Sequence, residues 1–186
     1  MTMVITNIKT TPVLVPFRYP PVTASGAISE LPLVLLDVET NVGLTGHAYL
    51  FVFLKGMLKP TIGCVAAVEE LVKGMSADPE QVDPILRRRL ELLDIHGILG
   101  QVLAGLDMAL WDIRAKSEDL SLAAVLGGTR DYLKSYNSCG LWVEKGDPEK
   151  VADQALELLA EGDFSAVKLR LGYETFEEDL AVVRAV

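Results

Sequence analysis

The sequence predicts an α+β protein built in two parts, and three features of the chain indicate it. Residues 4–51 are rich in β-branched side chains and are divided by turn signals, which favours an antiparallel sheet. Residues 60–116 carry apolar side chains at helical spacing. From about Asp131, strand and helix patterns alternate, which implies parallel strands with helical crossovers. We therefore expect one domain over residues 1–130 and the start of another over residues 131–186.

Three strands are expected at the beginning of the chain, over residues 4–15, 33–39 and 44–51. A turn at residues 41–43 joins the second strand to the third, which makes the sheet a meander. The connection between the first two strands, residues 18–29, is rich in Pro, Gly, Ser and Thr. At about twelve residues it is longer than a median connection. It is either a lid or binding loop, or a plain surface connection.

Helices are expected over residues 60–73, 84–94, 97–116 and 122–126. Gly74 is placed to end the first of them. Asp83 and Pro84 have the pattern of an N-cap and a first helical residue for the second. The third is apolar nearly all round, so we expect it to be buried between two layers.

After Asp131 the pattern predicts strand, helix, strand and helix, over residues 133–142, 148–161, 164–171 and from Thr175 onward. Thr175 and Glu178 have the spacing of a capping box. Two parallel strands with one and a half helices cannot cover both faces of a sheet. Residues 180–186 form an apolar helical stretch without a stop signal. We therefore expect the front of a larger α/β protein.

The composition argues against several classes of protein. The 186 residues carry a net charge of −9, and an acidic chain repels the phosphates of nucleic acids. The densest apolar run, residues 31–36, is far shorter than the ~20 residues of a membrane span. Cys64 and Cys139 have no metal-ligand spacing, which favours free thiols in a cytoplasmic protein. We expect neither nucleic acid nor a membrane as a partner.

Two cations stand out in the strand predicted over residues 164–171. Because side chains alternate along a strand, Lys168 and Arg170 share one face near its carboxyl end, where ligands bind in parallel sheets and barrels. Two like charges persist best beside an anion, so the pattern favours an acid substrate or metal-binding carboxylates nearby. The alternative is an edge strand with solvated cations. A lysine among cations can act as a base near neutral pH, whereas an arginine keeps its proton.

Other polar residues carry weaker signals. Ser138, on the preceding strand, either donates its hydroxyl to a substrate oxygen or is an ordinary strand serine. His47 lacks metal-ligand spacing and is interpreted as structural. Asp107 and Asp112 are expected to be hydrogen-bonded to neighbouring backbone or to cations such as Arg114.

Residues 104–116 read AGLDMALWDIRAK and are followed by Leu-Gly-Gly at 126–128. This stretch resembles the signature helix of the mandelate racemase/muconate lactonizing group of the enolase superfamily. Tyr19-Pro20, Gly46-His47 and Ala166-Val167-Lys168 fit the same family. The resemblance extends over all 186 residues in order.

The resemblance implies a fold and a metal. Residues 1–130 match an α+β capping domain, and residues 131–186 match the first two βα units of a modified β/α (TIM-like) barrel. The family binds Mg²⁺ through three carboxylates on the third to fifth barrel strands, so no residue of this chain is expected to be a metal ligand. The metal stabilises the enediolate that forms when a base removes the proton α to a carboxylate.

The resemblance also implies roles for particular residues. The second barrel strand of the family carries a Lys-x-Lys motif, whose first lysine contacts the substrate carboxylate and whose second is a base. Lys168 matches the first position, and Arg170 stands at the second, which departs from the motif. Ser138 matches a serine that hydrogen-bonds the substrate carboxylate. The loops that close over substrate contain the remaining expected binding residues, Val22, Thr23, Ile28 and Tyr49.

We therefore expect the front portion of a racemase or isomerase acting on a hydroxy acid or sugar acid. The alternatives are an acid-sugar dehydratase of the same superfamily, or a catalytically silent fragment that acts as a binding module. The 186-residue chain alone is expected to be inactive. A small carboxylic acid is the expected substrate, and a homo-oligomer the expected assembly.

Overall fold

The structure, a computed structural model, describes residues 2–17, 20, 22–23, 26–93, 95–138 and 147–186. The chain divides into two compact units. The first comprises Met1–Val15 and Leu31–Thr129, and the second comprises Pro16–Glu30 and Arg130–Val186.

The first unit is built on a three-stranded antiparallel sheet in the order β1-β4-β5. The strands are β1 (Ile5–Pro16), β4 (Glu30–Thr40) and β5 (Thr45–Phe51). In the pairing of β4 with β5, Leu35 lies opposite Tyr49 and Asp37 opposite His47. The turn between them contains Gly43 at a φ of 83°, a conformation that glycine adopts without strain. The predicted meander is confirmed.

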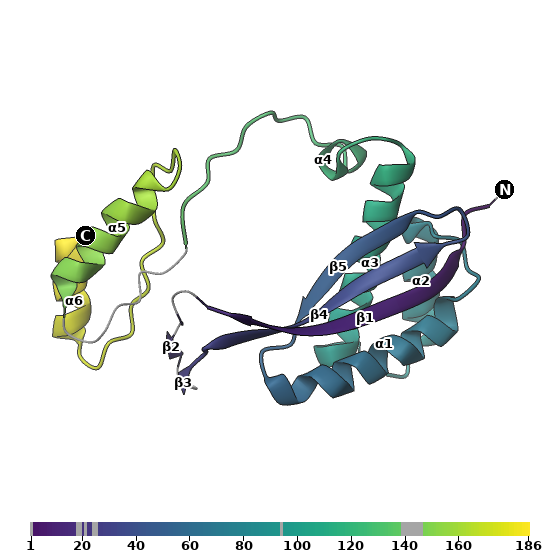
Figure 1. Cartoon of the computed structure of the whole chain (residues 1–186), viewed down its shortest axis with the longest axis horizontal. Helices are drawn as coiled ribbons and strands as arrows, with labels where there is room; N and C mark the ends of the chain where they lie inside the picture. The colour runs from purple at the N-terminus through teal and green to yellow at the C-terminus, as the bar shows by residue number, and fades with distance from the viewer. Residues whose placement is uncertain (1, 18–19, 21, 24–25, 94, 139–146) are drawn as a thin grey trace. The chain divides into compact units, whose positions relative to one another are not determined.

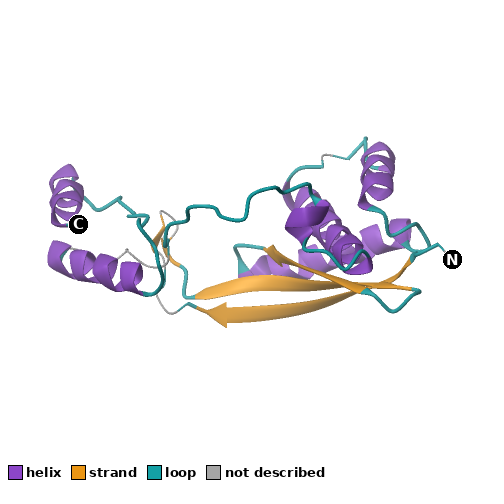
Figure 2. Cartoon of the chain, turned by 90° about the horizontal axis from the view of Figure 1, so that it is seen from above, coloured by secondary structure: helices purple, strands orange, loops and turns teal. Residues whose placement is uncertain are grey.

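Helices cover one face of this sheet, as both views show (Figure 1, Figure 2). They are η1 (Lys55–Met57), α1 (Leu58–Val72), α2 (Pro79–Arg89) and α3 (Gly97–Ser117), and the short helix α4 (Leu122–Val125) follows α3 and contacts it. The long helix α3 lies against both β5 and α1. Its residues Leu106, Ala109 and Ile113 are buried in the same core as Val34 and Leu50 of the strands. The prediction that this helix is buried between layers is correct along its sheet-facing side, although Met108 is exposed.

The predicted start of α2 is wrong. The helix begins at Pro79, and the carboxylate of Asp78 caps it by accepting a 3.0 Å hydrogen bond from the backbone N–H of Glu80. Pro84, expected to be the first residue, lies inside the helix. This part of the chain contains two Asp-Pro pairs five positions apart, and each has the N-cap pattern. The fold uses the earlier pair.

The second unit contains a small hairpin and two helices. β2 (Val22–Thr23) pairs with β3 (Gly26–Ala27) inside the long connection that we expected to be a loop. The helices are α5 (Pro148–Ala160) and α6 (Phe176–Ala185). Asp147 caps α5, and Thr175 and Glu178 form the predicted capping box at the start of α6.

The two strands predicted for this unit are much shorter than expected. Among the described residues of 131–138 and 164–171, the pairing is one parallel bridge between Asn137 and Val167. The bridge confirms the predicted parallel direction, and residues 139–142 of the first strand lie outside the described residues. Parallel ladders are stable when further strands and helices cover them. The described part of this unit offers two helices and no third neighbouring strand, which accounts for the short pairing.

Among the described helices, none has the length and apolar character needed to cross a membrane.

Candidate functional site

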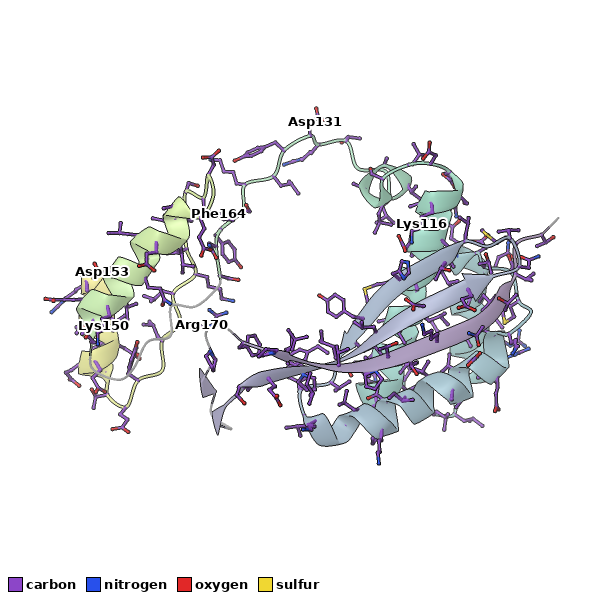
Figure 3. All side chains as sticks on the ribbon, viewed as in Figure 1. Lys116, Asp131, Lys150, Asp153, Phe164 and Arg170 are labelled. Carbon is purple, nitrogen blue, oxygen red and sulfur yellow. The ribbon has the colours of Figure 1, made fainter. Side chains whose placement is uncertain are left out.

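The segment between α5 and α6 positions the two predicted cations. Val167 and Leu169 pack against the apolar cluster formed by α5 and α6. Lys168, between them, is exposed, and Arg170, labelled in Figure 3, is half-buried. The predicted alternation therefore holds from 167 to 170, because the apolar side chains face the helices and the intervening ones do not. Leu171, expected on the apolar face, is instead 44% exposed.

Arg170 reaches back to the preceding segment of the unit. Its Nη1 atom donates a hydrogen bond of 2.8 Å to the backbone carbonyl of Ser138. Ser138 is half-buried. The structure thus brings together two residues that the sequence separates by 32 positions, both of which were predicted to belong to the site.

Lys168 is positioned through its backbone. Its N–H donates to the carbonyl of Asn137 over 2.9 Å, and the N–H of Asn137 donates to the carbonyl of Ala166 over 3.0 Å. These two bonds form the parallel bridge, so Ser138 lies one residue beyond the bridge and Lys168 one residue beyond its partner Val167. Sequence reasoning missed Asn137. The available signal was an amide residue directly before the candidate serine in a predicted strand.

The predicted loop residues divide between the two units. Val22 and Thr23 form β2, paired with Ala27 and Gly26 respectively. They belong to the second unit, as do Ser138, Lys168 and Arg170, and so does Ile28, which is half-buried. Phe17 and Ser29 close the base of this loop with a 3.0 Å backbone hydrogen bond.

Tyr49 lies in the first unit, on β5, and its side chain is 61% exposed. The strand is followed by Phe53 at a φ of 58°, a left-handed conformation that is uncommon for a residue with a bulky side chain. Rare backbone conformations of this kind cluster at ligand-binding segments. The segment from Tyr49 to Phe53 therefore presents a phenol beside a constrained turn.

His47, Asp112 and Lys116 form a structural network where β5 meets α3. The Oδ2 atom of Asp112 accepts hydrogen bonds from the backbone N–H of His47 over 2.8 Å and from Nζ of Lys116 over 2.7 Å. Burial opposes ionisation of Asp112, but these bonds outweigh it and hold its pKa below the ordinary value. His47 also pairs through Nδ1 with Asp37 over 2.8 Å. The predicted role of Asp112 is confirmed, although the cation is Lys116 and not Arg114.

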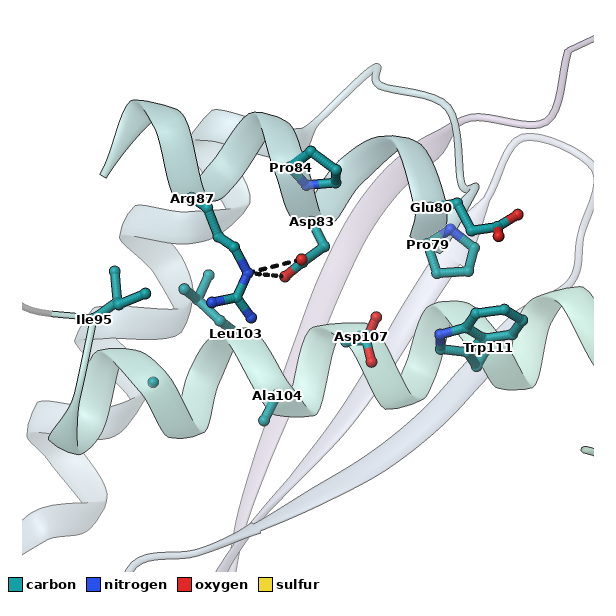
Figure 4. A pocket seen from close by; sticks show the side chains of 11 residues that line it. Pro79, Glu80, Asp83, Pro84, Arg87, Ile95, Leu103, Ala104, Asp107 and Trp111 are labelled. Atoms are coloured by element: carbon teal, nitrogen blue, oxygen red, sulfur yellow. Dashed lines mark hydrogen bonds and ion pairs between the residues drawn. The ribbon is translucent and has the colours of Figure 1, made fainter. Parts of the chain in front are cut away.

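A pocket of about 520 Å³ opens between α2 and α3 in the first unit (Figure 4). Arg87 and Asp83, which are paired over 2.8 Å, line it together with Trp111. Asp107 also lines it. Burial and the charge of Asp83 raise the pKa of Asp107, although the side chain of Trp111 hydrogen-bonds it and Arg87 lies near. Because Arg87 is already held by Asp83, Asp107 is the less stabilised carboxylate of the two.

The described residues do not supply a magnesium site. Across 2–17, 26–93, 95–138, 147–186 and the few described residues of the loop, no group of three His, Cys, Asp or Glu side chains is placed to hold a metal ion. The bond of Arg170 and the backbone bond of Lys168 place three candidate residues on the two neighbouring segments: Ser138, Lys168 and Arg170, a hydroxyl donor and two cations. Such a set can bind and orient an anion such as a carboxylate.

Comparison with known proteins identifies a family that matches most of the first unit. The family described as mandelate racemase/muconate lactonizing enzyme, N-terminal domain, matches residues 5–127. An arabinonate dehydratase of Saccharolobus solfataricus is 26% identical over 165 residues, which cover 84% of this chain and 42% of that protein. A D-galactarolactone cycloisomerase of Agrobacterium fabrum is 31% identical over 160 residues, covering 82% and 40% respectively.

Solved structures match over the whole chain. A crystal structure of an enolase from alpha pretobacterium bal199 with bound magnesium has a TM-score of 0.91 at 31% identity, covering 99% of this chain and 51% of that one. An enolase from Bradyrhizobium, complexed with magnesium and mandelic acid, has a TM-score of 0.86 at 28% identity and covers 100% and 50%. The chain therefore spans about half the length of the solved relatives, and about two fifths of the curated ones.

Proposed function

The chain belongs to the mandelate racemase/muconate lactonizing enzyme family, and from this premise we propose that it is the front part of an acid-sugar dehydratase. The complete enzyme would remove the proton α to the carboxylate of a sugar acid and expel a β-hydroxyl group. Residues 1–130 would form the capping domain and residues 131–186 the start of the barrel. The matched region, residues 5–127, and the length of the solved relatives support this division.

The observation that carries the proposal is the arginine at position 170. Racemisation needs a proton acceptor on each side of the α-carbon, because the proton leaves one side and returns to the other. A guanidinium keeps its proton at any working pH, since its pKa lies far above neutrality. Arg170 is in addition held by the carbonyl of Ser138, which fixes it as a charged donor. One side of the substrate therefore lacks a base at this position, which favours chemistry that needs only one.

Dehydration meets that requirement. The α C–H bond and the β C–O bond break: the single base takes the α-proton and, once protonated, gives a proton to the β-hydroxyl group, which leaves as water. The enol that remains becomes a 2-keto acid. Lys168 would bind the substrate carboxylate together with the hydroxyl of Ser138, and Arg170 would stabilise the negative charge that develops. Val22, Thr23, Ile28 and Tyr49 would contact the rest of the substrate.

A racemase or other isomerase is the second candidate. Lys168 follows the bridge residue Val167, and its side chain is exposed. Its amine could act as the base, a role that the guanidinium of Arg170 cannot take. The Bradyrhizobium relative was crystallised with mandelic acid, and the Agrobacterium relative is a cycloisomerase. Solved relatives hold magnesium, and the described residues of this chain do not form a site for it. The ligands would come from the remaining barrel strands.

Product analysis of the complete protein tests the proposal. The protein, verified by intact mass, is incubated with Mg²⁺ and with a set of aldonic acids, aldaric acids and both enantiomers of mandelate. We expect at least one sugar acid to give a product lighter by one water, detected as a 2-keto acid by semicarbazide. A change in optical rotation without loss of water would favour the isomerase, and no conversion of any acid would overturn both.

A further inference from the structure

Asn137 is a buried polar residue whose side chain caps the carboxyl end of helix α5. It is 5% exposed, and its Nδ2 atom donates to the backbone carbonyl of Leu158 over 3.0 Å and to Oε2 of Glu161 over 3.2 Å. Leu158 lies in the last turn of α5, where helix carbonyls have no partner within the helix. The amide of Asn137 satisfies one of them. A buried amide without such partners would be strongly unfavourable, so the contacts hold this residue in one place.

The backbone of the same residue joins the two segments that carry the candidate site. Its N–H and C=O bond respectively to the carbonyl of Ala166 and the N–H of Lys168. This parallel bridge is the pairing that the structure shows between these segments within the described residues. Asn137 is therefore the point at which α5 and both segments meet.

The register of this bridge decides which way the cations face. Because side chains alternate, a slip by one residue would exchange the faces of Lys168 and Val167 and of Arg170 and Leu169. It would bury charge against the apolar cluster of α5 and α6, and it would separate Arg170 from the carbonyl of Ser138. With one bridge and no longer ladder among the described residues, little else in the pairing opposes such a slip.

We propose that Asn137 is a positioning residue: by tying the end of α5 to the bridge, it fixes the register that presents Ser138, Lys168 and Arg170 on one side. This inference rests on the proposed function for its catalytic consequence. Its structural part, the locking of the bridge, stands on the hydrogen bonds alone. A residue that merely caps α5 would contribute to stability without affecting the geometry of Lys168.

The test uses the isosteric variant Asn137→Asp in the complete protein. The substitution keeps the volume but replaces the donor by a carboxylate that faces the carbonyl of Leu158 and the carboxylate of Glu161. In the double variant with Glu161→Gln, the new glutamine amide can donate to the new carboxylate, which restores one bond with donor and acceptor exchanged. Glu161→Gln alone keeps an acceptor for Asn137. Val151→Ala, in the buried part of α5, is the control for general destabilisation.

We expect kcat per folded molecule to fall at least tenfold in Asn137→Asp and to recover at least threefold in the double variant. Val151→Ala should lower Tm comparably and leave kcat within twofold. Amide hydrogen exchange at Lys168 should accelerate at least tenfold in Asn137→Asp, relative to the amide of Val182 in α6. Unchanged kcat together with unchanged protection of the Lys168 amide would overturn the proposal.

The two hypotheses fail in different ways. If the unaltered complete protein converts no acid, the proposed function fails, while exchange at the Lys168 amide still decides whether Asn137 locks the bridge. If the protein converts a sugar acid but Asn137→Asp affects only Tm, to the same extent as Val151→Ala, the positioning role is wrong and the proposed function is untouched. If Asn137→Asp does not fold, amide exchange is measured in the double variant. Protection of its Lys168 amide within threefold of the unaltered protein supports the proposal that residue 137 holds the bridge in register. Loss of that protection in a folded double variant contradicts the proposal.

Discussion

The Nη1 atom of Arg170 donates a 2.8 Å hydrogen bond to the backbone carbonyl of Ser138, and this bond crosses between the two segments that carry the candidate site. A guanidinium has several N–H donors in one plane, so it can hold this carbonyl and still present donors to an anion. An ammonium group at the same position would present its charge at one nitrogen atom, without a plane of several N–H donors. Arg170 therefore joins the two segments by a side-chain hydrogen bond and remains charged.

Gly46 sets the distance between β5 and α3. A Cβ atom built on Gly46 would collide with the backbone carbonyl of Ala109 and would lie 2.7 Å from Cγ1 of Ile113. We expect Gly46→Ala to lower the free energy of unfolding by about 3 kcal/mol, because a helix backbone cannot move aside as a side chain can. Urea unfolding followed by circular dichroism measures the change.

Gly63 offers a matched control for this substitution. It lies in the interior of α1, is exposed, and a Cβ atom there would meet nothing within 4 Å. Gly63→Ala should raise the free energy of unfolding by about 0.5–1 kcal/mol, through the lower entropy of the unfolded chain. Equal effects of the two substitutions would show that close packing of β5 on α3 is not what requires glycine at position 46.

Asp112 should stabilise the fold above its titration range and not below it. Its pKa is lowered in the folded state, since the bonds from Lys116 and His47 outweigh burial, so its contribution is present above the unfolded pKa of ~3.9 and is lost as pH falls through the folded value. We expect Asp112→Asn to cost roughly 1 kcal/mol at pH 7. The difference from the unaltered protein should be smaller at pH 3 than at pH 7, as measured by urea unfolding at both pH values. A constant difference would contradict the assignment.

Asp107, on the same helix, should behave in the opposite way. Its pKa is raised, first by burial and then by the charge of Asp83, so the stability it allows is fully present below the unfolded pKa and is lost as pH rises through the folded value. We expect Asp107→Asn to stabilise the fold at pH 7 by about 0.5 kcal/mol, a small gain because the carboxylate is partly solvated. Thermal unfolding at pH 7 and pH 3 should show the gain at the higher pH alone. A loss of stability at pH 7 would mean that the bond with Trp111 outweighs the burial.

Elements whose signals lie within a few residues could be predicted from the sequence. The turn at residues 41–43, the helix α3 and the capping box of Thr175 with Glu178 all follow from local spacing. The start of α2 could not be predicted as well. Asp78-Pro79 and Asp83-Pro84 offer the same local pattern, and the ion pair of Arg87 with Asp83 and the packing of the helix on α3 decide between them.

Long-range contacts account for the rest. The alternation of residues 167–170 predicted which face carries the cations, but it contains nothing about the carbonyl of Ser138 that Arg170 contacts. The strands predicted over residues 133–142 and 164–171 pair through one bridge in the described residues. The sequence pattern of a strand does not show which other strands will lie beside it, so it could not predict the length of the pairing. The role of Asn137 could not be predicted for the same reason, since its hydrogen-bond partners Leu158 and Glu161 lie more than twenty residues away in the sequence.

Exchange of the α-proton distinguishes chemistry that uses one base from chemistry that uses two. The complete protein is incubated in D₂O with Mg²⁺ and with each of the two C2 epimers of a sugar acid that it binds, and deuterium at the α-carbon is measured by ¹H NMR and mass spectrometry. We expect loss or exchange of the α-proton in one epimer only, and in both epimers after Arg170→Lys, which supplies a base on the second side. Equal exchange of both epimers by the unaltered protein would contradict it, and so would the absence of exchange or dehydration with either.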